Sequence, residues 1–149
     1  MVVTRNDPKE KAALQHHLAS EFEMKDLSAL KYFLGIEVAH SKQGIFLSQR
    51  KYILDILTDT GMLASKPADT PMELNHQLDE YPDQVPTNKG RYQRLVGGLI
   101  YLGHTRPDIA YAVSVVSQFM HAPSEAHMDA VNRILRYLKS SPGRGLMFA

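Results

Sequence analysis

The sequence predicts an α+β fold, because strand-like and helix-like patterns of apolar residues occupy different parts of the chain. In residues 32–39 the large apolar side chains of Tyr32, Leu34, Ile36 and Val38 fall on every second residue, the pattern of a strand. Residues 45–47 are expected to form a returning strand after a turn. Residues 88–138 instead carry apolar residues at intervals of three and four, the spacing of amphipathic helices. Residues 64–87 follow neither period and are rich in proline and acidic residues.

The N-terminal part is expected to begin with a short strand and a helix. Residues 2–4 are all β-branched and predict a strand stub. Asp7 is a favourable helix cap, and Pro8 suits the first helical position. The helix is expected to run to about residue 22 and to bury three apolar side chains: Leu14, Leu18 and Phe22.

A turn-rich connector over residues 24–30 leads to the expected hairpin. Gly35 falls inside the pattern of the first strand, where a glycine indicates close approach of another backbone. Ser48 follows the second strand and is a candidate cap for the next helix, which Gly61 ends. The apolar face of that helix is expected to hold Ile53, Leu54, Ile56 and Leu57.

The sequence divides into three regions. Residues 1–63 hold the first helix, the hairpin and the second helix. Residues 64–87 are expected to form an acidic, proline-rich surface linker. Residues 88–149 predict three helices, which begin near residue 88, at the Thr105 cap and at the Ser124 cap, and then a strand from Gly145.

Two adjacent glycines, Gly97 and Gly98, lie in the middle of the first of these three helices. Each costs about 1 kcal/mol of helix stability relative to alanine, so another group is expected to approach this backbone closely. Gln93, Gly97 and Tyr101 are four residues apart and line one face, with Arg94 one turn before the glycines. That face suits the minor groove of a nucleic-acid duplex. Close packing of another helix over both glycines is the alternative, and it is the commoner reason for a helical glycine.

Total charge identifies no partner, since the formal net charge is +1. The distribution is more informative: residues 1–87 hold 9 basic against 13 acidic residues, whereas residues 88–149 hold 8 against 3. A basic C-terminal part is consistent with a phosphate-facing surface, and equally with solvated helix faces. The absence of cysteine excludes a disulfide framework and a thiolate zinc site. No apolar run reaches membrane-spanning length, and no signal peptide is visible.

The residues show no catalytic or metal-ligating pattern. Asp55 and Asp59 share one helix face but lack the further acid that two-metal phosphoryl transfer needs. The sequence has no glycine-rich phosphate loop and no nucleophile elbow. None of the seven histidines has metal-ligand spacing. Four of them are expected at the surface: His16, His17, His121 and His127.

Six blocks of the sequence resemble the reverse transcriptase of copia-type retrotransposons, in the order in which that family carries them. The first three are Phe-Leu-Gly-Ile-Glu-Val at 33–38, Gly-Ile-Phe-Leu-Ser-Gln at 44–49 and Lys-Pro-Ala-Asp-Thr-Pro-Met at 66–72. The next are Tyr-Gln-Arg-Leu-Val-Gly at 92–97 and the most specific block, Thr-Arg-Pro-Asp-Ile-Ala-Tyr-Ala-Val at 105–113. The last is Arg-Ile-Leu-Arg-Tyr-Leu-Lys at 133–139. The resemblance covers nearly the whole chain and implies a plant source.

The resemblance implies a palm remnant followed by a helical thumb and connection region, which would lead toward a ribonuclease H domain. The hairpin resembles the primer grip, where Gly35 would let the primer backbone approach. The glycine-bearing helix resembles the thumb helix of retroviral enzymes, which tracks the minor groove of the template–primer. The nucleic-acid-binding residues that this implies are Phe33, Leu34, Gly35, Ile36, Arg91, Gln93, Arg94, Gly97 and Tyr101.

The resemblance also indicates what the chain would lack. The catalytic turn of the family, Tyr-X-Asp-Asp, would stand immediately before Met1, so the Mg²⁺ of the complete enzyme is not expected to bind here. We therefore expect a truncated RNA-directed DNA polymerase domain without catalytic residues or activity of its own. Two alternatives remain: a module that still binds an RNA–DNA duplex, and a piece that complements separate fingers–palm and ribonuclease H segments. The family implies a cytoplasmic or nuclear location.

Overall fold

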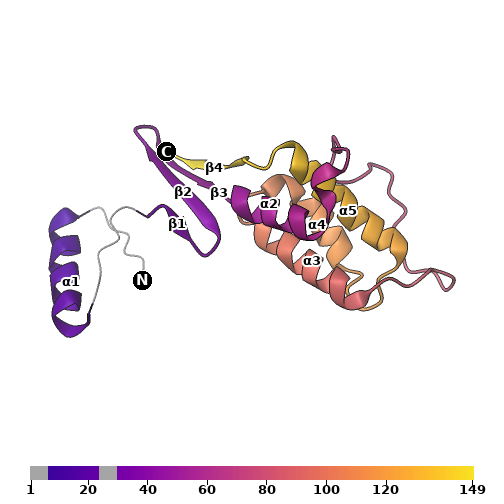
Figure 1. Cartoon of the computed structure of the whole chain (residues 1–149), viewed down its shortest axis with the longest axis horizontal. Helices are drawn as coiled ribbons and strands as arrows, with labels where there is room; N and C mark the ends of the chain where they lie inside the picture. Colours follow the sequence, from indigo (N-terminus) through magenta and orange to yellow (C-terminus); the bar gives the residue numbers. More distant parts are fainter. Residues whose placement is uncertain (1–6, 24–29) are drawn as a thin grey trace.

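The computed structural model describes residues 7–23 and 30–149. The strand expected at residues 2–4 and most of the connector expected over 24–30 lie outside the described residues. Figure 1 shows a body of helices at one end, a sheet beside it, and α1 (Pro8–Glu21) at the far end. Mixed helix and antiparallel sheet is the composition that the α+β prediction requires.

The helical body is built from α2 (Arg50–Asp59), α3 (Lys89–Leu102), α4 (Ala110–Ser117) and α5 (Glu125–Ser140), with the short 3₁₀ turns η1 (Met62–Ala64) and η2 (Pro107–Ile109). The apolar faces of these elements form one core. Leu57, Leu99, Val116 and Ile134 are completely buried in it. The helix expected from a Thr105 cap begins later, because η2 precedes α4 and Thr105 is buried in another contact.

The helical core includes residues from both sides of the expected region boundary at residue 63. Ile53 and Leu57 of α2, which the sequence division placed in the N-terminal region, pack into the same core as α3 and α5. The apolar stripe of α2 finds its cover against these C-terminal helices. The packing unit therefore begins at α2.

The segment over residues 64–87 lies along the helical body. The backbone N–H of Ala68 donates to the Arg136 carbonyl, and the N–H of Thr87 donates to the Pro123 carbonyl. Met72 is buried in the core. Much of this segment is exposed, as expected of a linker, but its backbone follows α5 and the α4–α5 connection instead of separating two regions.

The sheet has four antiparallel strands in the order β1 (Tyr32–Phe33), β2 (Ile36–Ser41), β3 (Gly44–Ser48) and β4 (Gly145–Phe148). The expected C-terminal strand thus pairs with β3 of the hairpin (Figure 1). In this pairing Leu146 lies opposite Leu47, and Phe148 lies opposite Ile45. The β3 edge of the hairpin is therefore covered by β4.

Gly35 lies in a turn and not within a strand, which corrects the sequence interpretation. Phe33 pairs with Ile36, so Leu34 and Gly35 form a two-residue connection with φ of 48° and 82°. Such connections match the twist of the flanking strands when both central residues have positive φ. Glycine adopts this conformation without a steric penalty, which explains its place after Leu34.

The first helix has the predicted start but not the predicted burial. Asp7 caps α1 by accepting from the N–H of Lys9, and Pro8 occupies the first turn. No residue of α1 is buried, and Phe22 beyond its end is 63% exposed. The expected burial of Leu14, Leu18 and Phe22 is wrong for the described residues, because no other described element covers α1 closely (Figure 1).

The last helix, α5, starts at the predicted Ser124 cap, but His127 in its first turn is not at the surface as expected. Ser124 caps α5, and the His127 ring nitrogen Nδ1 accepts from the Ser124 N–H at 3.0 Å. His127 is completely buried and stacks on Phe119 with ring centroids 3.9 Å apart. It was expected at the surface, but its capping bonds satisfy the ring and make burial favourable.

Candidate nucleic-acid interface

The α3 helix has one buried face and one open face. Its apolar side chains at three- and four-residue spacing are all in the core: Tyr92, Leu95, Val96, Leu99 and Leu102. Asn88 caps the helix by accepting from the N–H of Arg91 at 2.8 Å. The buried face of α3 therefore anchors the helix in the core, while Arg91, Arg94 and Gly97 lie on its exposed side.

Tyr92 fixes this helix to its neighbour. Its hydroxyl donates to the Val116 carbonyl of α4 at 2.6 Å, and burial raises the pKa of Tyr92 to about 12. Gln93 is held in a similar way, since its amide nitrogen donates to the Met120 carbonyl at 3.0 Å. The Gln93 side chain is thus partly engaged within the protein, and its amide oxygen accepts no hydrogen bond from the residues that the structure describes.

The two adjacent glycines have different environments. A Cβ placed on Gly98 would lie 3.2 Å from the Tyr52 hydroxyl and 3.3 Å from the Ile56 Cδ1, so α2 packs closely over this position. A Cβ placed on Gly97 would meet no atom of the described residues within 4 Å. The packing explanation therefore applies to Gly98, and Gly97 remains open on the exposed face.

Tyr101 connects α3 to the turn between β1 and β2 at Leu34 and Gly35, which we call the hairpin tip. Its hydroxyl donates to the Leu34 carbonyl, and a Cβ on Gly35 would lie 3.4 Å from the same hydroxyl. The Tyr101 ring also meets the Tyr52 ring edge-on at 5.3 Å. The structure thus brings Leu34 and Gly35 against one end of the Gln93, Gly97, Tyr101 stripe, although the two groups are far apart in the sequence.

The hairpin tip exposes apolar side chains beside this contact. Leu34 is 72% exposed, Phe33 is exposed, and Ile36 is half-buried. Eight residues separate Gln93 from Tyr101, which corresponds to about 12 Å along a helix. The predicted site is therefore an elongated surface, with Arg91, Gln93 and Arg94 toward one end of α3 and the hairpin tip at the other.

The two arginines of this surface have no acidic partner. Arg91 and Arg94 are both exposed, and neither side chain forms an ion pair with any residue that the structure describes. Their charges are not neutralised within the protein. An exposed guanidinium without an internal partner is available to a phosphate.

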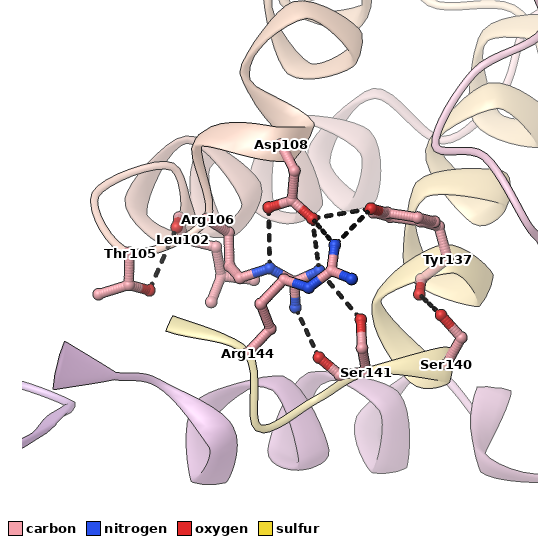
Figure 2. A network of polar contacts seen from close by, with 8 residues as sticks. All are labelled: Leu102, Thr105, Arg106, Asp108, Tyr137, Ser140, Ser141 and Arg144. Atoms are coloured by element: carbon pink, nitrogen blue, oxygen red, sulfur yellow. Dashed lines mark hydrogen bonds and ion pairs between the residues drawn. The ribbon is translucent and has the colours of Figure 1, made fainter. Parts of the chain in front are cut away.

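Sequence reasoning did not assign a role to the polar network at the corner after α3 (Figure 2). Arg106 is completely buried and donates to both carboxylate oxygens of Asp108, at 2.9 and 2.8 Å. Its Nη1 also donates to the Ser141 carbonyl at 2.8 Å. Tyr137 and Arg144 reach the same Asp108 oxygen, at 2.8 and 3.2 Å.

This network positions the sheet. The Arg106 guanidinium holds the pKa of Asp108 well below its usual range, so Asp108 stays ionised beside it. Ser141 and Arg144 lead directly into β4, which pairs with β3. Buried Thr105 adds a bond of 2.7 Å from its hydroxyl to the Gln49 amide oxygen, at the junction of β3 and α2. The only sequence signal was the specific 105–113 block that contains Arg106 and Asp108.

The described residues contain no group of three His, Asp or Glu side chains that could hold a metal ion. Over residues 7–23 and 30–149, no helix has the length and apolar character that crossing a membrane requires.

Comparison with known proteins identifies relatives of this chain. Residues 1–74 match the family model described as reverse transcriptase (RNA-dependent DNA polymerase). The retrovirus-related Pol polyprotein from transposon RE1 of Arabidopsis thaliana is 45% identical over 146 residues, which cover 98% of this chain. The corresponding polyprotein from transposon TNT 1-94 of Nicotiana tabacum is 36% identical over 159 residues and 99% of this chain. An uncharacterised mitochondrial protein of Arabidopsis thaliana is 46% identical over 133 residues, which cover 87% of this chain and 53% of that protein.

No solved structure matches this chain significantly. The chain spans about a tenth of the length of the Pol polyproteins that it matches. The matches to these polyproteins extend over the helical body as well as the N-terminal half. The chain therefore belongs to the reverse transcriptase family, and within it resembles the Pol polyproteins of copia-type retrotransposons of plants.

Proposed function

We propose that this chain is the part of a retrotransposon reverse transcriptase that holds the template–primer duplex, along one surface formed by the hairpin tip and the open face of α3. The contact between the Tyr101 hydroxyl and the Leu34 carbonyl joins the two halves of this surface. The 149 residues would supply the grip on the duplex within the larger polyprotein.

The observation that carries the proposal is the open position of Gly97. A glycine in a helix interior costs about 1 kcal/mol relative to alanine, and at Gly97 no packing contact within the described residues offsets that cost. Close approach of an external backbone or sugar edge is a reason for a helix without a side chain at this point. The neighbouring Gly98 needs no such reason, because α2 covers it.

The flanking groups suit a duplex. Arg91 and Arg94 supply charge for phosphates, and the Tyr101 ring supplies an apolar surface for a sugar. The amide oxygen of Gln93 can accept from a groove edge, where the minor groove offers little sequence information. The expected binding is thus sequence-independent and weakens as salt increases.

Binding of a fluorescent RNA–DNA hybrid to the 149-residue chain tests this proposal. Gly97→Leu is expected to weaken hybrid binding while the chain stays folded, because a leucine side chain would hold the duplex away from the helix. Arg94→Gln is expected to lower the slope of log affinity against log salt by about 1. Lys42→Gln is the matched control, since Lys42 lies in the turn at the other end of β2 from the hairpin tip. Equal affinity of Gly97→Leu and the parent chain would refute the proposed grip.

A second candidate function is assembly with a separate segment of the same enzyme. Leu14 and Phe22 are exposed, and no residue of α1 is buried by the described part of the chain. Exposed apolar side chains such as these favour a partner that covers them. Adding a separately produced fingers–palm segment should then protect α1 amides from hydrogen exchange, and unchanged exchange would count against assembly.

A further inference from the structure

A cavity of about 250 Å³ lies between the segment over residues 71–78 and α5. Part of its wall is apolar and includes Met72, Leu78 and Ala130. The rest of its wall is polar or charged and consists of Glu73, His76, Gln77, Asp129, Arg133 and Arg136. None of these residues belongs to the α3 surface.

Three nitrogen atoms of this wall are buried and form no hydrogen bond with the residues that the structure describes: His76 Nδ1, Arg133 Nε and Arg136 Nε. An arginine Nε always carries a proton, so two of the three are donors. His76 Nε2 lies 3.3 Å from the Tyr111 hydroxyl, and when it accepts from that hydroxyl, His76 Nδ1 carries the ring proton and becomes the third donor. The two arginine Nε atoms, and His76 Nδ1 in that tautomer, can therefore donate to an acceptor in the cavity.

The Arg133 and Arg136 guanidinium groups differ in how many hydrogen-bond acceptors they have. Arg133 donates from Nη1 to Glu73 at 2.8 Å and from Nη2 to the Thr70 hydroxyl at 3.1 Å. The Arg136 guanidinium bonds no acceptor among the residues that the structure describes, and its terminal nitrogens are not buried. Arg136 is thus a half-buried cation at the cavity wall without a counter-ion.

We propose that this cavity binds a small oxyanion, a phosphate or a carboxylate group, through the Arg136 guanidinium with His76 as a second donor. A guanidinium offers two parallel N–H groups that match both kinds of oxyanion. The cavity has room for such a group and for a short apolar stem beside Met72 and Leu78. Asp129 lines the same cavity and opposes an anion, so it limits the affinity.

Titration of the 149-residue chain with inorganic phosphate, and separately with acetate, tests this site. Chloride keeps the ionic strength constant, and the ring signals of His76 are followed by NMR. We expect a saturable shift of the His76 signals, and the two titrations distinguish a phosphate site from a carboxylate site. Arg136→Gln should weaken binding about tenfold, and Asp129→Asn should tighten it. Arg50→Gln removes an exposed arginine outside the cavity wall and should leave binding unchanged.

A linear response without saturation, or the same affinity in the parent chain and Arg136→Gln, would overturn the proposal, because both indicate a general ionic effect. If Arg136→Gln does not fold, the proposal is tested by the His76 shift in the parent chain and by the affinity of Asp129→Asn. No saturable His76 shift in the parent chain, or no tighter binding in Asp129→Asn, overturns it as well. The result is independent of hybrid binding, since no residue of the cavity wall lies on α3.

Discussion

Arg106 and Asp108 form a two-pronged ion pair across a single proline at the corner between α3 and α4 (Figure 2). The Arg106 side chain is 0% exposed and the Asp108 side chain is 25% exposed. Arg106 also donates to the carbonyl of Ser141 at the end of α5. The pair therefore fixes the α3–α4 corner to the start of the segment that leads into β4.

Asp108→Asn should lower the free energy of unfolding by about 3 kcal/mol at pH 7, because it leaves the buried Arg106 charge without its partner. Chemical denaturation measures this loss. Asp59→Asn is the matched control, since Asp59 is exposed and forms no ion pair in the described part of the chain. A loss no larger than that of Asp59→Asn would show that Arg106 does not depend on Asp108.

The same pair predicts an acid dependence of stability. The pKa of Asp108 is lowered in the folded chain by Arg106, so its contribution is complete above the unfolded pKa near 4 and is lost as pH falls below it. The difference in unfolding free energy between the parent chain and Asp108→Asn should shrink between about pH 4 and pH 2. A difference that stays constant over this range would contradict the assignment.

Leucine at the two adjacent glycines should have opposite effects on stability. Gly97→Leu should raise the free energy of unfolding by about 0.5–1 kcal/mol, since leucine favours helix and Gly97 has open space. Gly98→Leu should lower it by about 1–3 kcal/mol, because its side chain would collide with Tyr52 and Ile56. Thermal unfolding of both variants checks this, and equal shifts would mean that α2 does not pack over Gly98.

Tyr101→Phe should loosen the hairpin tip without disturbing the helical core. The variant keeps the ring contact with Tyr52 but loses the hydrogen bond to the Leu34 carbonyl, which is worth about 1 kcal/mol. Hydrogen exchange should become faster at the backbone amides of β1 and β2 and stay unchanged in α4 and α5. Tyr32→Phe is the control, because the Tyr32 hydroxyl forms no hydrogen bond with any residue that the structure describes. Unchanged exchange at the tip in Tyr101→Phe would show that the hydroxyl does not hold it.

His127 should make the chain less stable in mild acid. Burial lowers the pKa of His127 in the folded state, so the unfolded chain binds the proton more readily. Its stabilising contribution is complete above the unfolded pKa near 6.5 and declines as pH falls below that value. His127→Gln should be less stable than the parent chain at pH 7.5, and the difference should narrow by pH 5.5. A gap that widens on acidification would contradict this.

The starts of several helices could be predicted because their signals are local. Asp7 and Ser124 cap the helices that follow them, as predicted, but the expected Ser48 cap of α2 is wrong, because the Ser48 hydroxyl donates to Glu37 instead. Close packing over the paired glycines was one of two explanations that the sequence left open, and it applies at Gly98. The turn at Leu34 and Gly35 was missed, because alternation of apolar residues continues through a two-residue turn and resembles one long strand.

Long-range relationships could not be predicted in the same way. Nothing near Tyr101 in the sequence indicates that its hydroxyl reaches Leu34, and nothing near Leu146 indicates that β3 is its neighbour. The burial of Arg106 and His127 also depends on partners that only the fold supplies, namely Ser141 for Arg106 and the Asp79 carbonyl for His127. The sequence was enough to name the individual residues of the predicted interface. It was not enough to predict which of these residues are in contact.

The pairing of β3 with β4 has a consequence for the order of folding. It joins residues about 100 positions apart, so it would close a very long loop if the strands met in an unfolded chain. β3 runs directly into α2, and β4 follows α5 after a few residues, so docking of these two helices already brings the strands together. The helical body should therefore form first, and the sheet should assemble on it as a late and more easily reversed step.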